Sequence, residues 1–462
     1  MKQTKKTRKV PNGRLKDSRN NWKKKAVLRR LENEQLKKQL KERTVSRDKW
    51  KTKYQELKKT GLVSNVFDGE KARKHQYSLA LMVMVLELYK YGGMSLRSCR
   101  HSLICMFVCL NLSIRVPSHN TIRNWLCKGG IYRVKMRQSS SASYVLIVDE
   151  SITFGSEKIL LILGVKSDKI DEKKALSHND MEVLYVGASK EWKGEQIKTE
   201  LEQIAKQETI KYVVSDKGTN LRKAYNLLNY SHIEDCTHVF ANDLKRIYGK
   251  DADFEAFRKL IGKLRRDWNL SKEKSKYMPP TMRGKMRFAN IFPCVIWAQY
   301  ILANWSNLSE EIQASLIFLK EKSAFIQSLI EVEKIFKFVC SKLKTNGFSK
   351  EEKQEILCVL SAMEVGKIGA IFIKNCEDYL ENLSKKRKLL AQDNLLCSSD
   401  IIESYFGKFK TKINPNSRSG LTEFIFTIAT FGRSFSQQEV KQAMQNIKCK
   451  DLKLYRNTAR AA

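Results

Sequence analysis

Three β-rich runs in the middle of the chain constrain its fold more than any other feature of the sequence. The runs YVLIVD, KILLILGV and MEVLYVGA occupy residues 144–149, 158–165 and 181–188. Each is short, rich in branched apolar residues and bounded by polar segments, which favours buried strands over helices. The next segments predict a helix, a strand, a helix, a strand and a helix, at residues 192–206, 210–216, 219–228, 237–240 and from 242 onward. This order predicts an α/β fold with a mixed five-stranded sheet and flanking helices.

Two of the predicted strands end in an aspartate. Asp149 closes the first strand and Asp216 closes the fourth. If those strands are neighbours, the two carboxylates converge at one edge of the sheet, where a rigid backbone can hold functional side chains. A strand-end aspartate is more often a turn residue, and Lys217 and Gly218 after Asp216 fit that interpretation. The pair together is stronger evidence for a site than either aspartate alone.

A third carboxylate is available on a helix predicted at residues 400–413, which carries Glu403. The spacing of Asp400 and Glu403 also matches a helix-capping box, which would make Glu403 structural. Lys410, two turns further on the same face, favours the functional interpretation because it suits a DNA phosphate. Three hard oxygen donors favour Mg²⁺ or Mn²⁺, and two such ions support in-line displacement at phosphorus. We therefore expect the three carboxylates to be metal ligands and catalytic residues.

The chain beyond residue 250 is predicted to be almost entirely helical. Residues 251–395 show no strand pattern and are too long for a loop, so we expect an inserted helical domain. It would separate two parts of the α/β core, at residues 138–250 and 396–435. A further helix is predicted at residues 421–431, and residues 436–462 read as a basic tail.

Positive charge is concentrated in the first 60 residues, which contain 23 basic and 6 acidic side chains. Residues 1–25 have almost no large apolar side chains, which is typical of a disordered basic arm. Beyond them, a heptad register interrupted by two arginines indicates a weak coiled coil; it consists of Leu36, Leu40, Trp50, Tyr54 and Leu57. A solvated single helix explains the same pattern equally well.

Residues 61–137 predict a compact helical unit. Helices are expected at about 77–90 and 95–110, and a third, HNTIRNWL, begins after Ser118 and ends near Gly129. A short, polar-faced third helix in a basic chain is the pattern of a helix-turn-helix DNA-binding domain. Its expected DNA contacts are Asn120, Arg123, Asn124 and Lys128. An ordinary three-helix scaffold is the alternative.

The composition favours a polyanionic partner. The 87 Lys and Arg residues outnumber the 49 Asp and Glu residues, for a net charge of +38, and nucleic acid explains this excess better than an anionic membrane surface does. No apolar run approaches the roughly 20 residues of a membrane-spanning helix, and we expect no secretory signal. The hydrophobic content of 42% excludes wholesale disorder.

The 11 cysteines include no CxxC pair, which indicates reduced thiols in a cytoplasmic, nucleoid-associated protein. His101, Cys105 and Cys109 are spaced four apart and could share one helix face. A metal site is one interpretation of this group. A stripe of small core residues is the preferred one, because structural zinc usually takes four ligands from separate loops.

The motifs around the three carboxylates resemble those of the DDE transposases of insertion sequences, whose catalytic domain is RNase H-like. The likeness rests on VDES, VVSDKG and SSDIIESYFGKFK, at residues 148–151, 213–218 and 398–410. It implies that the three carboxylates form the catalytic triad of that family. It covers roughly residues 140–430.

Two further elements match the same family. Glu403 and Lys410 have its E-x6-K spacing, in which the basic residue contacts transposon-end DNA. DCTH at residues 235–238 resembles its C/D-x2-H element, which implies that Asp235 and His238 lie near the site. A structural histidine at the end of a strand is the alternative.

The helical segment after residue 250 resembles the insertion domain of some branches, where an aromatic side chain can hold a flipped base. Trp268, Trp297 and Trp305 are the candidates, and buried core tryptophans are the alternative. The Tyr and Arg of the Y-R-E-K signature of one large branch are absent, because residues 396 and 399 are Leu and Ser.

The resemblance implies a DNA transposase that binds terminal inverted repeats and performs metal-dependent strand cleavage and strand transfer. Two transposon ends must be brought together, so a homodimer or larger homo-oligomer is expected. Two other functions remain open at this point. One is a domesticated or inactive transposase acting as a DNA-binding protein, and the other is an RNase H-like structure-selective nuclease.

Overall fold

The computed structural model describes ten parts of the chain: residues 37, 40–41, 43–53, 69–112, 114–137, 142–151, 157–171, 174–282, 288–413 and 421–452. The expected basic arm lies outside the described residues, and so does most of the predicted coiled coil, of which residues 43–53 are helical. The chain divides into two compact units. One comprises Met1–Lys71 and Gln76–Leu81, and the other comprises Ala72–His75 and Met82–Ala462.

Five strands in the second unit form one mixed sheet. They are β1 (Ser143–Glu150), β2 (Lys158–Lys166), β3 (Met181–Ser189), β4 (Thr209–Ser215) and β5 (His232–Glu234). Their spatial order is β3-β2-β1-β4-β5. The first three strands are antiparallel neighbours, and β4 and β5 continue the sheet parallel to β1. The structure thus confirms the predicted mixed sheet and places the first and fourth strands side by side.

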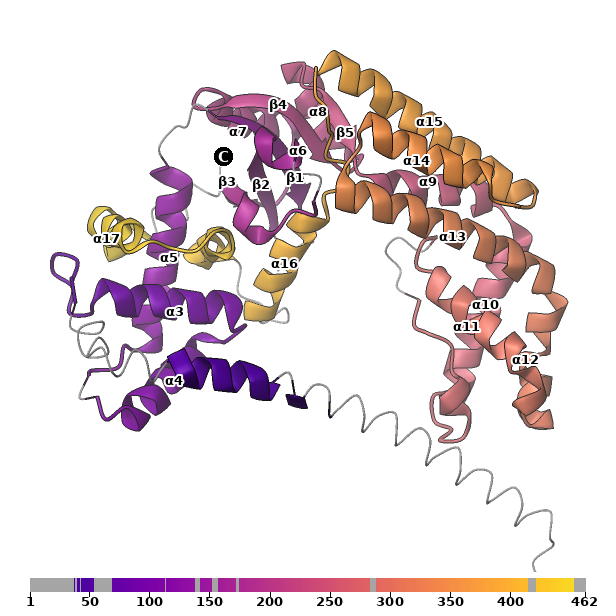
Figure 1. The fold of residues 1–462 in the computed structure, drawn as a ribbon, viewed down its shortest axis with the longest axis horizontal. Coiled ribbons are helices and arrows are strands. Elements are labelled where there is room, and N and C mark those ends of the chain that lie inside the picture. The colour runs from indigo at the N-terminus through magenta and orange to yellow at the C-terminus, as the bar shows by residue number, and fades with distance from the viewer. Residues whose placement is uncertain are drawn as a thin grey trace, which may run out of the picture. The chain divides into compact units, whose positions relative to one another are not determined.

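Two amphipathic helices, α7 (Gly194–Ala205) and α8 (Thr219–Leu228), cover one face of this sheet (Figure 1). Trp192 is fully buried just before α7 and donates its indole N–H to the carbonyl of Lys158 at 3.1 Å. Apolar side chains at helical spacing on α7 pack with strand residues in one core cluster; they are Ile197, Leu201 and Ile204. The short helix α6 (Ser167–Asp171) follows β2.

The fifth strand lies earlier in the chain than the sequence pattern predicts. Residues 237–240, expected as a strand, belong to α9 (Cys236–Tyr248), and β5 ends at Glu234. Asp235 begins the helix by accepting a hydrogen bond from the backbone N–H of His238 at 3.0 Å. Val239 and Phe240 are buried because they lie on one face of α9, so a short apolar run was misassigned to a strand.

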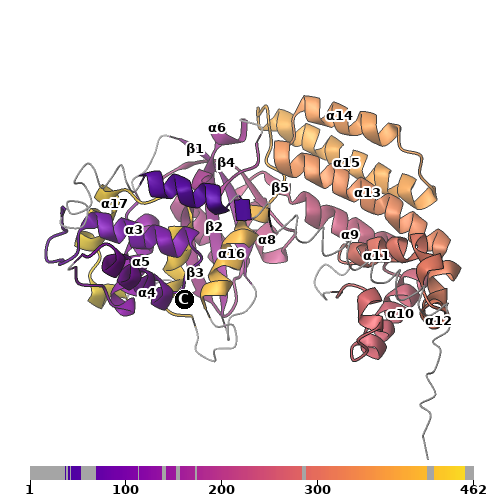
Figure 2. The ribbon, with the colours of Figure 1, turned by 60° about the horizontal axis from the view of Figure 1, so that its bottom comes forward.

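The described residues between 251 and 395 are mostly helical, as predicted. The helices are α10 (Ala252–Trp268), α11 (Phe292–Ala303), α12 (Glu310–Glu321), α13 (Ser323–Asn346), α14 (Lys350–Ser361) and α15 (Lys367–Leu389). Figures 1 and 2 show α13, α14 and α15 running side by side, in agreement with their mutual contacts. Trp268 is buried in the core, and the indole of Trp297 donates to the carbonyl of Tyr277 at 2.9 Å. Trp305 lies under the ammonium of Lys320, 4.3 Å from the ring centre to Nζ.

Between residue 79 and β1 lie the helices α3 (Leu79–Tyr91), α4 (Leu96–Cys109) and α5 (His119–Lys135), and the side chains of Ser95 and Ser118 cap α4 and α5. The C-terminal elements are α16 (Asp400–Lys412), the 3₁₀ helix η4 (Glu423–Phe431) and α17 (Gln437–Asn446). Shorter 3₁₀ turns are η1 (His178–Asp180), η2 (Lys274–Tyr277), η3 (Trp305–Asn307) and η5 (Cys449–Asp451). The segment expected as a basic tail therefore contains a helix, α17, which packs on α5.

Helix α5 continues past Gly129, where the sequence predicted its end. A β-carbon at Gly130 would lie 1.9 Å from the carbonyl oxygen of Phe426, and one at Gly129 would lie 3.1 Å from the ring of Phe435. The two glycines let η4 and the segment after it approach the helix backbone directly. They are interior residues at a close contact, and the interpretation of Gly129 as a helix end was wrong.

The group formed by His101, Cys105 and Cys109 lies on an exposed face of α4, so it is not the expected stripe of core residues. The buried face of α4 consists of Cys99, Leu103 and Phe107. Within the described ranges, no helix combines the length and apolar character that a membrane crossing requires.

Candidate active site

Asp149 and Asp216 lie at the same edge of the sheet because their strands are parallel neighbours in register. Ile147 of β1 pairs with Val214 of β4, and each aspartate follows its strand partner by two residues. A backbone N–H fixes each carboxylate: Glu150 N donates to Asp149 Oδ1 at 2.7 Å, and Gly218 N donates to Asp216 Oδ1 at 2.8 Å. The predicted turn role of Asp216 is therefore present together with its convergence on Asp149.

Asp149 sits in an environment that opposes its negative charge. Burial and, next, the charge of Asp216 raise the pKa of Asp149 to about 7, and Glu403 adds to the effect, while a hydrogen bond from the Glu150 N–H and the charge of His238 oppose it. In the part of the chain that the structure describes, neither aspartate forms an ion pair with a lysine or arginine. Buried like charges without a cationic partner are typical of a site that takes a cation.

Glu403 lies in the first turn of α16, which contacts β1 (Figure 1). Ser399 occupies the N-cap position of the helix without a side-chain capping bond, and Asp400 is the first helical residue. Asp400 is therefore not a capping residue, and the capping-box explanation of Glu403 does not apply. The Glu403 side chain is 63% exposed, and its Oε1 atom lies 3.9 Å from Nε2 of His238.

His238 is the cationic partner of Glu403. Its interaction with Glu403, followed by the charges of Asp235 and Asp216, raises the pKa of His238 to about 9 against the opposing effect of burial. The same contact lowers the pKa of Glu403, with smaller contributions from Lys344 and Lys410. A separation of 3.9 Å is longer than a hydrogen bond, so the attraction is mainly between charges. His238 thus lies next to Glu403, at the near-site position that the sequence predicts.

Asp235 is buried behind the site, with 1% of its surface exposed. Its Oδ1 caps α9 through His238 N, while its Oδ2 accepts hydrogen bonds from Ser399 N at 2.6 Å and from Ser399 Oγ at 3.0 Å. One carboxylate therefore joins the start of the helix that carries His238 to the start of the helix that carries Glu403. Asp235 positions the site rather than lining it.

The three carboxylates fit Mg²⁺ or Mn²⁺ because all their donor atoms are hard oxygens. In addition, no lysine or arginine among the described residues pairs with Asp149. The three carboxylates are not spaced as in a closed metal site. Among the described residues, no group of three or more His, Cys, Asp or Glu side chains is close enough to hold one metal ion. Glu403 is paired with His238, so binding of a metal between all three carboxylates requires Glu403 to leave that contact.

The predicted DNA contacts on α5 are largely unavailable. Lys128 is 4% exposed, and its Nζ lies 3.5 Å from the carbonyl of Met444, so its expected role as a surface contact is contradicted. Arg123 pairs with Glu423 at 2.8 Å, and Asn124 is half-buried. Only Asn120 of the four is exposed. The cause is the packing of η4 and α17 over α5, which a local sequence pattern does not reveal.

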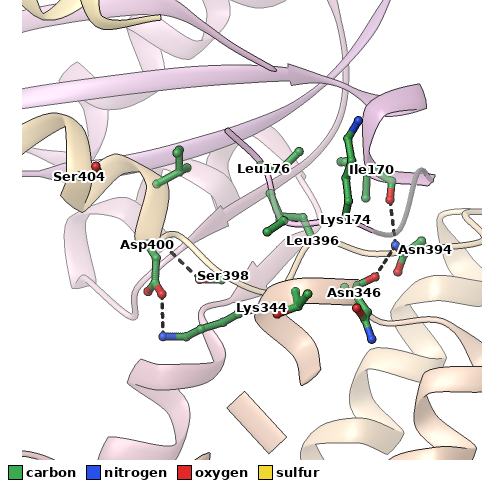
Figure 3. Close-up of a pocket in the computed structure, with 14 residues that line it drawn as sticks. Ile170, Lys174, Leu176, Lys344, Asn346, Asn394, Leu396, Ser398, Asp400 and Ser404 are labelled. Carbon is green, nitrogen blue, oxygen red and sulfur yellow. Dashed lines mark hydrogen bonds and ion pairs between the residues drawn. The ribbon is translucent and has the colours of Figure 1, made fainter. Parts of the chain in front are cut away.

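A cavity of about 300 Å³ lies beside the first turn of α16 (Figure 3). Lys344 of α13 pairs there with Asp400 at 2.7 Å. The amide nitrogen of Asn394 donates to the carbonyls of Ile170 and Asn346 at 2.9 and 2.8 Å. None of the three carboxylates lines this cavity. Sequence reasoning missed it because its walls come from segments that are far apart in the chain.

Comparison of the sequence with protein-family models and with curated proteins finds no match. The class of protein defined by the fold is an α/β protein with a mixed five-stranded sheet and a large helical addition. Its candidate site is a cluster of carboxylates at the ends of two parallel strands, completed by a glutamate from a distant helix.

Proposed function

We propose that this protein is a DDE-type DNA transposase with an RNase H-like catalytic core. It would bind terminal inverted repeats and carry out metal-dependent cleavage and strand transfer. One observation carries the proposal: Asp149 is buried beside Asp216 and within the electrostatic reach of Glu403, and no lysine or arginine in the described part of the chain pairs with it. A site with this arrangement gains most from divalent cations, and phosphodiester chemistry is the reaction that such cations assist.

Asp149, Asp216 and Glu403 would hold the metal ions. When bound, two Mg²⁺ or Mn²⁺ ions polarise the phosphoryl group and activate the attacking oxygen. The hydrogen bonds from Glu150 N and Gly218 N hold the two aspartates in a fixed orientation. Glu403 is more adjustable, since its side chain is exposed and its ion pair with His238 spans 3.9 Å. His238 therefore restrains Glu403 until it turns toward the aspartates.

The basic character of the chain supports DNA as the substrate. The net charge of +38 favours a polyanion, and Lys410 lies on the same helix as Glu403, close enough to lower its pKa. Joining two DNA ends to a target requires at least two active sites, so the proposal includes a homodimer or larger homo-oligomer. The corresponding location is the nucleoid in the cytoplasm.

The proposal is tested with DNA fragments taken from both flanks of the gene, incubated with the full chain in Mg²⁺ or Mn²⁺. The expected products are nicked fragments and joined molecules, and both should disappear in chelator. Asp149→Asn should reduce product formation by at least about 1,000-fold while leaving DNA binding intact. Equal cleavage by wild type and Asp149→Asn would refute the assignment.

The pairing of Glu403 with His238 favours one alternative, an inactive transposase that acts as a DNA-binding protein. In that case the wild type binds DNA but forms no nicked or joined product with either metal. A structure-selective RNase H-like nuclease, in contrast, would cut branched or hybrid substrates without joining products. The same assay therefore separates the three functions when branched and RNA–DNA hybrid substrates are included.

A further inference from the structure

A cluster of basic side chains lies where α3, η1 and α16 meet, on a face of α16 that is about 140° around the helix axis from Glu403. It consists of Lys90, His178 and Lys408. The ring of His178 stacks on Tyr405 of α16 at 4.8 Å between ring centres, and its Nε2 lies 3.2 Å from Ser404 Oγ. These contacts join η1 to α16, which lies more than 220 residues later in the sequence.

Lys90 is 4% exposed, and its ammonium is held by neutral groups. It donates to Tyr91 Oη at 2.9 Å and to Asn179 Oδ1 at 3.4 Å. Tyr91 Oη also donates to Asn179 Oδ1, at 3.0 Å, which fixes the orientation of the amide. The Asn179 side chain is exposed, and its NH₂ group has no acceptor among the described residues. Asn179 therefore presents two free donors beside a buried positive charge.

The cluster lacks acidic partners. Neither Lys90 nor Lys408 forms an ion pair within the described parts of the chain. Two acidic residues of the same segments are engaged elsewhere: Glu87 accepts from Phe435 N at 3.1 Å, and Asp180 accepts from Ser177 N at 2.8 Å. Cations gathered without carboxylates repel one another until an anion binds.

The electrostatic effect of this crowding is visible in the neighbouring groups. Burial, followed by the charges of Lys408 and Lys90, lowers the pKa of His178 to about 4. Burial, followed by the charge of Lys90, lowers the pKa of Lys408, with Tyr91 opposing. No carboxylate contributes to either shift, which agrees with the contacts.

We propose that Lys90, Lys408 and the amide of Asn179 form a binding site for a phosphate of the DNA backbone. Lys408 and Asn179 donate directly, and Lys90 supplies charge from behind. His178, neutral and stacked on Tyr405, spaces the cluster and holds η1 against α16. The inference rests on the proposed function for its choice of DNA, while the anion site itself follows from the cluster.

The placement on α16 sets the distance to the carboxylates. Lys408 lies five residues after Glu403, which corresponds to about 7.5 Å along the helix axis. A phosphate held here lies about 140° around α16 from Glu403, so Lys408 acts as a positioning residue for the flanking DNA and not for the scissile phosphate itself.

The test compares Lys408→Gln with Lys206→Gln in the full chain. Lys206 is an exposed residue at the end of α7, just before β4, at the opposite end of that strand from Asp216. Both variants lose one positive charge, so the global electrostatic effect is matched. Duplex DNA binding is measured by fluorescence anisotropy over a range of salt concentrations, and thermal unfolding is measured in inorganic phosphate and in chloride at equal ionic strength.

We expect Lys408→Gln to weaken DNA binding about 5- to 10-fold at low salt and to reduce the salt slope by about one, with Lys206→Gln near wild type. Phosphate should stabilise the wild type and Lys206→Gln more than Lys408→Gln. Equal DNA affinity of the two variants would overturn the proposal. Phosphate stabilisation lost in Lys408→Gln without a loss of DNA affinity would overturn it too, because the site would then take free phosphate.

The test of the phosphate site can succeed or fail independently of the test of the proposed function. If the wild type cleaves no DNA with either metal but Lys408→Gln still loses affinity relative to Lys206→Gln, the phosphate site stands and the catalytic proposal fails. If the wild type cleaves DNA, Lys408→Gln should raise the DNA concentration needed for half-maximal cleavage more than it lowers the maximal rate. Cleavage by Lys408→Gln that matches Lys206→Gln in both quantities contradicts the positioning role.

Discussion

Asp235 and Ser399 are 164 residues apart in the sequence, yet the Asp235 carboxylate accepts hydrogen bonds from both the backbone N–H and the hydroxyl of Ser399. The same carboxylate caps α9. Because Asp235 is buried, removing it leaves several donors without an acceptor, and unsatisfied buried donors cost more than the bonds themselves contribute.

We expect Asp235→Ala to lower the free energy of unfolding by about 2–4 kcal/mol. Asp251→Ala is the matched control, since Asp251 caps α10 through one bond to Phe254 N at 2.7 Å and should cost about 1 kcal/mol. Urea unfolding at pH 7 measures both variants. Similar losses in the two would show that the bonds to Ser399 contribute little.

Asp149→Asn should stabilise the metal-free protein at alkaline pH. The folded-state pKa of Asp149, about 7, lies above its ordinary value of 3.8, so stability is lost as pH rises through that window. The shift corresponds to at most about 4 kcal/mol above pH 7 and to nothing below pH 3.8. The melting temperature of Asp149→Asn should therefore exceed that of the wild type at pH 8 and match it near pH 4.

Adding Mg²⁺ or Mn²⁺ at pH 8 should reverse this order. Metal binding to the folded state raises the melting temperature of the wild type, and the loss of one carboxylate weakens that effect in the variant. A variant that gains as much from the metal as the wild type does would argue against Asp149 as a ligand.

His178 should make the fold sensitive to mild acid. Its folded-state pKa is about 4, below its ordinary value of 6.5, so its contribution to stability is complete above pH 6.5 and is lost as pH falls toward 4. His178→Gln should reduce the drop in melting temperature between pH 7 and pH 5. His101→Gln, on an exposed face of α4, is the control and should keep the drop of the wild type.

Gly130→Ala should be strongly destabilising, by about 3 kcal/mol or more, because its β-carbon would collide with the main chain at Phe426. Gly262→Ala, in the middle of α10, is the control. A β-carbon there meets only the end of the Arg266 side chain at 3.7 Å, so the substitution should stabilise the helix by about 0.5–1 kcal/mol. Thermal unfolding measures the stability of both variants. Equal changes in melting temperature would contradict the close contact between α5 and η4.

The sequence predicted those parts of the fold that depend on local pattern. The first four strands followed from apolar runs, and the shared edge of Asp149 and Asp216 followed from the carboxylates that end the first and the fourth of them. The prediction of the fifth strand was wrong because residues 237–240, which belong to α9, have the composition of a short strand. The prediction that Lys128 contacts DNA failed for another reason: the elements that bury this side chain lie about 300 residues later in the chain. Contacts of that kind leave no trace in a local window.

The candidate site, like the fold, could be predicted from the sequence only in part. Glu403 could be selected from the sequence by its spacing to Lys410, but its pairing with His238 depends on how α9 and α16 meet. The bond between Asp235 and Ser399 and the cluster around Lys408 also arise from tertiary contacts. A motif can therefore name the residues of a site without specifying which of them face one another.

The hydrogen bond from Leu396 N to the hydroxyl of Tyr212, at 2.8 Å, ties the segment before α16 to β4 across 184 residues. The sheet and its two aspartates are complete once β5 has been synthesised, but Glu403 can dock only after the whole of α10 to α15 has followed. During translation the five strands and both aspartates therefore leave the ribosome well before the third carboxylate does. The order of synthesis keeps a nascent chain from assembling all three carboxylates until nearly the whole protein has been made.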